Sequence, residues 1–194
     1  MGRHAESIEA PVMLVAMPQI VDPFFWHSVV LLVDYTAEGS LGLVINRATE
    51  LKVADVLREL EIAWTGDPEE IVHLGGPVQP QLGSVLYRSE GNGTDEASAE
   101  IVDGLCVSQN IETLRRLATS LPFEIRLVLG YAGWSAGQLD EEIRRHDWLV
   151  APVDVGQVFA PDPENVWERV LHSIGIRPES LPTIPFDGSD EVPS

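Results

Sequence analysis

The sequence predicts an α+β protein with a mixed, largely antiparallel sheet. Short apolar runs of strand length recur along the chain, and segments in which apolar residues recur at helical spacing interrupt them. These strands and helices do not alternate regularly enough to require a doubly wound parallel sheet. With 194 residues, of which 44% are hydrophobic, the chain can bury one sizeable core but hardly two. We therefore expect one folded domain.

The first three predicted strands are residues 12–17, 28–33 and 41–45, which are rich in valine and leucine. The third run can pair with the second as a hairpin. Gly42 interrupts the third run. A glycine within a strand indicates a bulge or a close approach of another backbone segment at that position.

Two helices are predicted in the middle of the chain. Apolar residues fall on one helical face from position 53 to position 60. A second helix begins after Asn110, a good N-cap, and ends before Pro122. The chain between these helices and after the second one supplies further predicted strands, at residues 71–74, 84–87, near 101, and at 125–129.

Two more helices are predicted in the last third of the chain. One carries Leu139 and Ile143 on the same face, and a short strand at residues 148–150 follows it. The last helix has Asp162 as its expected N-cap and Gly175 just past its end, which is the usual punctuation of a helix. The total is therefore about four helices.

The charge and the cysteine content exclude several classes of function. The chain has 31 acidic and 12 basic residues and a formal charge of -19. Because nucleic-acid binding depends on Lys and Arg that neutralise phosphates, we expect no direct nucleic-acid binding. The single Cys106 cannot form an internal disulfide framework, and its apolar neighbours predict a buried thiol. The five histidines show no metal-ligand spacing, so we expect no metal and no cofactor.

The ends of the chain are predicted to differ from its centre. We expect a flexible N-terminus at residues 1–11, a single domain at 12–176, and a disordered tail rich in proline and acidic residues at 177–194. No apolar run approaches the ~20 residues that cross a bilayer. The N-terminus also lacks the apolar core of a signal peptide. We therefore expect a cytoplasmic protein without membrane contact.

Five motifs in fixed order resemble the YqgE/AlgH family. They are FWHSVVLL at 25–32, GLVINR at 42–47, GGPV at 75–78, GYAGW at 130–134, and GQL followed by EI within 137–143. The resemblance spans about residues 12–175 and implies a compact α+β domain whose sheet curls into a barrel-like body. It implies no established activity, and the family label of transcriptional regulator identifies no DNA-binding element.

Three positions depart from the family pattern. His27 stands where an arginine is usual, Asp34-Tyr35 where Glu-His is common, and Ala48 where a proline often follows Asn-Arg. Functional sites that depend on those family residues are not carried over to this chain.

Residues 133–137, GWSAG, form a G-x-S-x-G motif between a predicted strand and a predicted helix. This is the context in which some hydrolases present a nucleophilic serine. A triad would use His146 or His172, and both lie in helical segments, where a catalytic histidine is unusual. We therefore keep a hydrolase that uses Ser135 as an alternative and assign no catalytic residue.

The glycines of the same segment allow a different function. Gly130, Gly133 and Gly137 could form a tight strand-to-helix turn whose free amides bind an anion or a nucleotide phosphate. Their spacing does not match the dinucleotide fingerprint. A purely structural turn packed under Trp134 is favoured, because glycine often serves geometry alone.

Polar and glycine residues at other strand ends complete the set of candidates. Arg47 could fix a carboxylate or a phosphate with its planar guanidinium, whereas the alternative is an ion pair or bonds to strand-end carbonyls. The tryptophans at 26, 134, 148 and 167 are predicted to be core. The candidate ligand-binding residues are Asn46, Arg47, Gly75, Gly76, Gly133, Trp134, Ser135 and Gly137.

These observations favour a non-enzymatic binding or regulatory protein. Its partner would be another protein or a small anionic ligand. The alternative is a hydrolase, or an anion- or nucleotide-binding protein, that uses Ser135 and the loop at residues 130–137.

Overall fold

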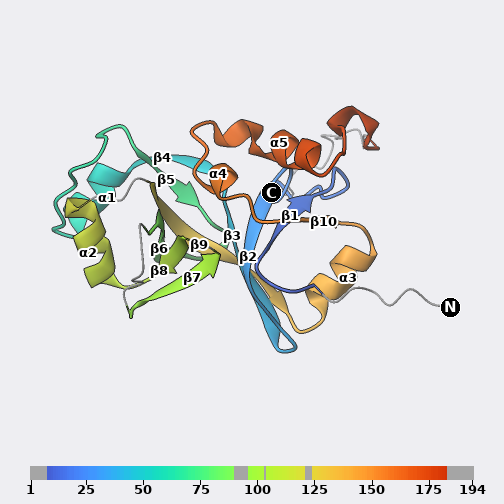
Figure 1. Ribbon diagram of the computed structural model, residues 1–194, viewed down its shortest axis with the longest axis horizontal. Helices are drawn as coiled ribbons and strands as arrows, with labels where there is room; N and C mark the ends of the chain where they lie inside the picture. The colour runs from blue at the N-terminus through green and yellow to red at the C-terminus, as the bar shows by residue number, and fades with distance from the viewer. Residues whose placement is uncertain (1–7, 90–95, 103, 121–123, 183–194) are drawn as a thin grey trace, which may run out of the picture.

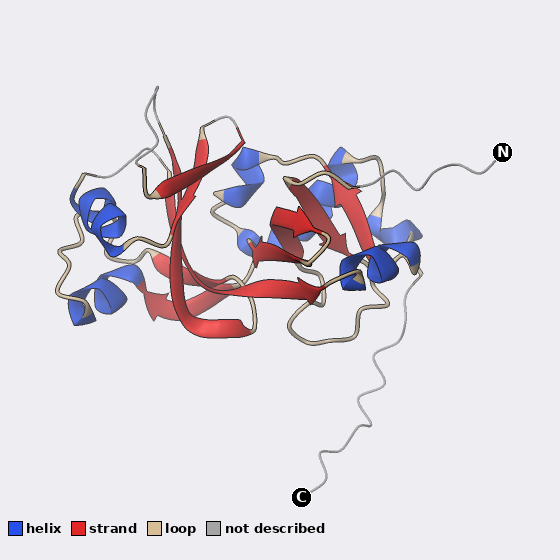
Figure 2. Cartoon of the chain, turned by 90° about the horizontal axis from the view of Figure 1, so that it is seen from below, coloured by secondary structure: helices blue, strands red, loops and turns tan. Residues whose placement is uncertain are grey.

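The computed structural model describes residues 8–89, 96–102, 104–120 and 124–182. In these segments ten strands form one curled sheet, with helices packed on its outer faces (Figures 1 and 2). The predicted α+β class and the barrel-like curl of the sheet are confirmed. The predicted flexible N-terminus (residues 1–11) and the predicted disordered tail (177–194) lie partly outside the described residues.

One half of the molecule is built from strands of the two chain ends. The neighbouring antiparallel strands are, in order, β10 (Trp148–Ala151), β1 (Val12–Ala16), β2 (Val29–Thr36) and β3 (Gly39–Val44). Alternate residues of β1 and β2 enter two different core clusters, so both faces of these strands are buried. Burial on both faces explains why these strands are continuous apolar runs.

The other half contains the strands from the middle of the chain. They are β4 (Ala48–Lys52), β5 (Ile71–Leu74), β6 (Val78–Arg88), β7 (Ser98–Val102) and β8 (Leu105–Ser108). The β5 strand runs parallel to β9 (Ile125–Ser135), whereas β6 is antiparallel to it, so the sheet is mixed. The sequence analysis missed β4 and β8, which are short and, for β4, mostly exposed.

The β9 strand joins the two halves and corrects one prediction. We expected a strand at 125–129 and then a glycine loop, but β9 continues to Ser135. Its first part pairs with β6, and residues 132–135 pair with β3. Gly130 has a φ of +70°, a left-handed conformation that glycine adopts without strain. The predicted anion-binding loop is therefore mostly strand.

Five α-helices are present in the described segments. Asn110 caps α2 (Ile111–Thr119) as predicted, with its side chain accepting bonds from two backbone amides. The other helices are α1 (Val53–Glu59), α3 (Gln138–Arg144), α4 (Val155–Val158) and α5 (Val166–Ser173). Four of the five were predicted, and α4 is a single turn that the sequence analysis missed.

The start of the last helix differs from the prediction. Asp162 precedes a 3-10 turn, η1 (Pro163–Asn165), and makes no capping bond. Its carboxylate instead accepts hydrogen bonds from Arg169 and Asn165, which lower the pKa of Asp162 to about 2. Gly175 does lie just past the helix end, with a φ of +79°. A second 3-10 turn, η2 (Pro178–Ser180), follows.

Two further predictions can be compared with the packing. The β2 register shifts between Leu32 and Asp34, opposite Gly42, and a Cβ atom on Gly42 would lie 2.5 Å from Val30 Cγ1. Gly42 thus marks both a bulge and a close approach. Three of the four tryptophans predicted as core are buried, but Trp26 is 49% exposed, so that prediction is wrong.

Candidate functional site

The predicted candidates at the end of β3 stabilise a neighbouring loop. Asn46 is buried; its amide donates to the His27 carbonyl at 2.9 Å and accepts from the Val29 amide at 2.8 Å. Arg47 donates from Nε to the Phe24 carbonyl at 3.1 Å and from Nη2 to the Trp26 carbonyl. Arg47 therefore makes the carbonyl bonds that the alternative interpretation predicted.

The Gly75-Gly76 pair lies beside the same strand end. The Leu74 amide donates to the Arg47 carbonyl at 2.8 Å, and the Val44 amide donates to the Gly75 carbonyl at 2.8 Å. A Cβ atom on Gly76 would lie 1.8 Å from the backbone carbon of Tyr131. The pair thus allows the chain to cross closely over β9.

Ser135 lies at the exposed end of β9, where it pairs with Gly39. Its backbone amide donates to Gln138 Oε1 at 3.0 Å. Within the described residues, the Ser135 hydroxyl makes no hydrogen bond with a histidine or an acid. Gly137 has a φ of +73° and precedes α3 as its N-cap residue. The GWSAG segment therefore has the exposure of a hydrolase motif without the arrangement of a triad.

Trp134, another predicted candidate, belongs to the core. Its Nε1 donates to Glu142 Oε2 at 2.8 Å, and Trp148 Nε1 donates to the same oxygen at 2.8 Å. Glu142 therefore holds two buried indoles in place, and Trp134 is not presented as a ligand-binding surface.

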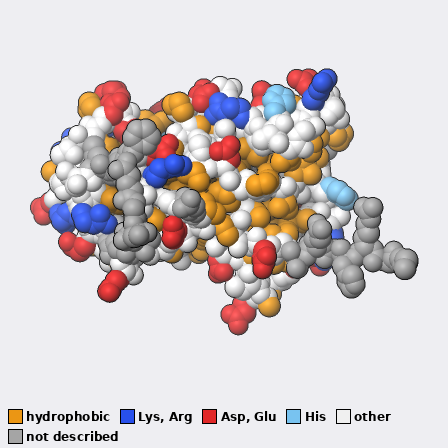
Figure 3. Space-filling model, in the orientation of Figure 1, with side chains coloured by type: hydrophobic (Ala, Val, Ile, Leu, Met, Phe, Trp, Pro, Cys, Tyr) orange, Lys and Arg blue, Asp and Glu red, His pale blue; other side chains and the backbone are white. Residues whose placement is uncertain are grey.

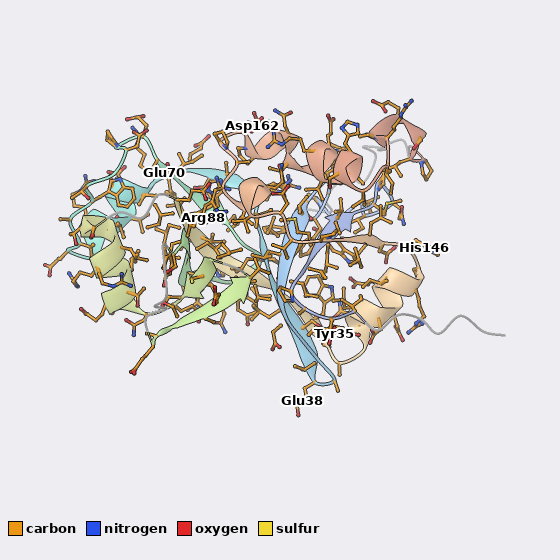
Figure 4. The ribbon with its side chains drawn as sticks, in the orientation of Figure 1. Tyr35, Glu38, Glu70, Arg88, His146 and Asp162 are labelled. Atoms are coloured by element: carbon orange, nitrogen blue, oxygen red, sulfur yellow. The ribbon has the colours of Figure 1, made fainter. Side chains whose placement is uncertain are left out.

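A cavity of about 440 Å³ lies between the start of β9, β5 and the segment before α5. Glu70 lines this cavity, and so do Pro161 and Pro163, the two neighbours of Asp162; Figure 4 labels Glu70 and Asp162 in the upper part of the view. None of the eight predicted candidates lines this cavity. The lining residues are Asp67, Glu69, Glu70, Ile71, His73, Glu124, Ile125, Arg126, Phe159, Pro161 and Pro163.

His73 is a buried polar side chain of this cavity. It is 2% exposed, and neither ring nitrogen makes a hydrogen bond of normal geometry. Burial, and then the charge of Arg126, lower the pKa of His73 to about 4. The nearby backbone of Ile71 acts in the opposite direction and raises that pKa. The imidazole is therefore neutral at neutral pH, with one donor and one acceptor nitrogen.

Arg126 is the second buried polar side chain and is 5% exposed. Its Nη1 donates to the carbonyls of Val158 and Ile45 at 2.5 and 3.3 Å, and its Nη2 donates to the Ala160 carbonyl at 2.8 Å. Its Nε has no partner. Burial lowers the pKa of Arg126 to about 10, so the guanidinium stays charged at neutral pH.

Acidic side chains surround this cation without pairing directly with it. Lys52 contacts Glu69 at 2.7 Å, and Arg88 contacts Glu124 at 2.8 Å. Glu70 makes no side-chain hydrogen bond or ion pair with any described residue. Burial raises its pKa, and the charge of Arg126 opposes that shift. Glu70 therefore offers an unpaired carboxyl group to whatever enters the cavity.

A second cavity, of about 570 Å³, lies between the β2–β3 hairpin and β7–β8 and differs in chemistry. Its lining contains no charged side chain, and its polar groups bond to one another or to the backbone. For example, Ser108 Oγ donates to the Ala97 carbonyl at 2.7 Å, and Gln109 Nε2 donates to Ser84 Oγ at 3.2 Å. Of these two cavities, the one at Arg126 has buried side-chain nitrogens without a hydrogen-bond partner among its described lining residues.

The sequence did contain a signal for the missed residues. His73 and Arg126 interrupt the apolar runs of β5 and β9, where a polar side chain must be buried. Buried polar groups are normally paired, so such positions point to a special environment. Their convergence could not be recognised, because it depends on the parallel pairing of β5 with β9.

The buried His73 predicts a fold that is sensitive to acid. Its pKa is 6.5 ordinarily and about 4 in the folded protein. Below pH 6.5 the unfolded chain therefore binds a proton that the folded chain does not, and stability falls until about pH 4. Between about pH 7 and about pH 4.5 this effect costs about 2 kcal/mol.

Urea unfolding of the wild type and of His73→Gln at both pH values measures this effect. When the pH is lowered, the free energy of unfolding of the wild type should fall by about 2 kcal/mol more than that of the variant. His146→Gln, at an exposed histidine, is the control and should behave as the wild type does. Equal losses in the wild type and His73→Gln would show that His73 has the same pKa in the folded and the unfolded state.

Comparison with known proteins agrees with this fold. A profile of the AlgH-like family matches residues 13–179. A UPF0301 protein of Myxococcus xanthus is 38% identical over an alignment of 175 residues that covers 89% of this chain and 94% of that protein. A UPF0301 protein of Methylobacterium nodulans is 37% identical over an alignment of 191 residues that covers 93% of this chain and 90% of that protein.

Two solved structures have the same fold. The solution structure of the AlgH protein from Pseudomonas aeruginosa has a TM-score of 0.74 and 32% identity, over 91% of this chain and 94% of that one. A crystal structure from Corynebacterium diphtheriae has a TM-score of 0.73 and 24% identity, over 89% and 90%. The curled sheet with its helices defines a class of α+β half-barrel proteins. The chain belongs to the AlgH-like family, as the sequence motifs predicted.

Two kinds of feature are absent from the described residues. These residues contain no group of three or more His, Cys, Asp or Glu side chains placed to hold a metal ion. They also contain no helix with the length and hydrophobicity to span a bilayer.

Proposed function

We propose that this protein is a non-enzymatic binding protein that takes a small polar molecule into the cavity of His73 and Arg126. The supporting observation is the pair of nine-tenths-buried side chains with unpartnered nitrogens in one cavity. An unpaired buried donor or acceptor costs about 1–3 kcal/mol. A ligand that pairs with these nitrogens recovers that free energy, which is a direct source of affinity.

The chemistry of the walls defines the ligand. Arg126 Nε–H needs an acceptor, such as a carboxylate or a carbonyl oxygen. Glu70, on the wall, needs a donor and favours a cation. A small zwitterion with a carboxylate and an amine satisfies both groups. The sequence analysis expected a small anionic ligand or another protein as the partner. The proposed ligand is such an anion, and it carries a positive charge as well.

Binding is favoured over catalysis by the lining of the cavity. Among the described residues that line it there is no serine, threonine, cysteine or lysine, and no hydrogen bond joins His73 to one of the lining carboxylates as a nucleophile–base pair would require. A regulatory role would then act through ligand-dependent contact with another protein, because the charge of -19 disfavours DNA. We place the protein in the cytoplasm, in keeping with its buried free thiol, Cys106.

Thermal-shift and calorimetric titrations test this proposal. Free α-amino acids, succinate and inorganic phosphate are the probes, so that zwitterions are compared with plain anions. We expect a zwitterion to raise the melting temperature, and Glu70→Gln to weaken its binding. The control is Glu50→Gln, at an exposed acid outside the cavity. No shift with any probe, or equal effects of the two variants, would contradict the proposal.

A further inference from the structure

An aromatic stack rises from the core to the surface at the loop before β2. The Trp26 ring stacks on the His27 ring at a centroid distance of 3.7 Å and an interplanar angle of 14°. The opposite face of His27 stacks on Trp167 at 3.9 Å and 9°. Trp167 is 4% exposed, and its Nε1 donates to the Ala16 carbonyl at 2.7 Å. The outermost ring, Trp26, is thus anchored through His27 to a buried residue.

The loop that carries Trp26 is fixed by hydrogen bonds. Asp22 Oδ1 accepts from the Phe24 amide at 2.8 Å. Arg47 donates to the Phe24 and Trp26 carbonyls, and Asn46 donates to the His27 carbonyl. The predicted candidates Asn46 and Arg47 therefore hold the exposed indole in one orientation. A group held in its binding orientation loses little entropy on binding.

The surface around Trp26 combines exposed apolar area with negative charge. Trp26 is 49% exposed and Val21, in the same loop, is 59% exposed. Burial and then the charge of Arg47 lower the pKa of His27, whereas the charge of Glu168, which is exposed on α5, opposes them, so Glu168 lies within electrostatic reach of the stack. The Arg47 guanidinium donates to the Phe24 and Trp26 carbonyls beneath the loop. Figure 3 shows Asp and Glu side chains spread over the face of the molecule that it draws. The whole chain carries a formal charge of -19.

We propose that Val21, Trp26 and Glu168 form a docking surface for a basic segment of another protein. An arginine of that segment stacks on the open face of Trp26, and Glu168 pairs with its charge. Trp faces attract guanidinium groups, and Trp and Arg are both enriched at interface hot spots. The charge of -19 opposes a second copy of this chain and an anionic membrane as occupants. This surface shares no residue with the Arg126 cavity, so failure of one proposal would not contradict the other.

An NMR titration with defined peptides tests this inference. The probe is an acetylated, amidated Gly-Arg-Gly-Arg-Gly peptide, and its partner carries citrulline, which is neutral, in place of each arginine. We expect the arginine peptide to shift the indole N–H signal of Trp26. Trp26→Ala and Glu168→Gln should each weaken its binding at least about threefold, as loss of a surface cation–π or charge contact does.

Two matched controls distinguish this surface from general attraction to an acidic protein. Leu51→Ala removes an equally exposed apolar side chain from β4, and Glu50→Gln removes an exposed acid. Both should bind the arginine peptide as the wild type does. Equal binding of the citrulline peptide, or equal effects of variants and controls, would overturn the inference. So would Trp26-dependent dimerisation in sedimentation, or Trp26-dependent binding to phosphatidylglycerol vesicles.

Discussion

Replacing Gly76 by alanine is expected to prevent stable folding. The new Cβ atom would lie 1.8 Å from the Tyr131 backbone carbon and 2.2 Å from the Ala132 nitrogen. Both are main-chain atoms of β9, which is paired with β3, β5 and β6. No side-chain rotation relieves this overlap, so the segment at Gly76 must move away from β9. We expect a loss of more than about 4 kcal/mol, in the range of the most severe substitutions.

Gly83→Ala is the matched control for this prediction. A Cβ atom on Gly83 would meet only Leu129 Cδ2, at 3.8 Å, which is ordinary van der Waals contact. This variant should remain within about 1 kcal/mol of the wild type. Soluble yield and urea unfolding report the outcome. Similar stability of the two variants would mean that the backbone at Gly76 and the backbone of β9 are farther apart than these distances indicate.

Arg126→Met is expected to cost about 3 kcal/mol or more, because three buried carbonyls lose their donors. The methionine fills much of the space but donates no hydrogen bond. The affected carbonyls belong to Ile45, Val158 and Ala160, so the contact between the end of β3 and α4 should loosen most. Hydrogen exchange of the amides in these segments, together with urea unfolding, measures the effect.

Arg88→Met is the control for Arg126, because its salt bridge with Glu124 is partly exposed. Exposed ion pairs contribute about 1 kcal/mol or less. A loss at Arg126 no larger than that at Arg88 would show that the buried guanidinium is not a structural donor. The thermal-shift probes should then be repeated, because the cavity would be more flexible than its hydrogen bonds indicate.

The parts of the fold that could be predicted are those with strong local patterns. The apolar runs of β1 and β2, the period of α1 and the Asn110 cap of α2 follow from local chemistry. The β9 strand was predicted too short because Gly130 breaks the local pattern. Pairing with β3 and β6 continues the strand through that glycine, and such long-range bonds leave no trace in a short sequence window.

The candidate site could be predicted only in part. Asn46 and Arg47 were identified as candidate ligand-binding groups, with bonds to carbonyls as the alternative for Arg47, and in the structure both support the Trp26 loop. The cavity escaped prediction because it joins residues 67–73, 124–126 and 159–163, which are distant in the sequence. Trp26 was assigned to the core because composition alone does not show which side of a loop meets solvent.

The most direct test of the central claim is a crystal structure at high resolution of the protein purified without added ligand, with attention to the cavity of Arg126. Our account predicts density for a small organic molecule that accepts a hydrogen bond from Arg126 Nε and contacts His73 and Glu70. The same nitrogens bonded to protein atoms, or a cavity that holds only ordered water, would contradict the claim that this cavity is a binding site.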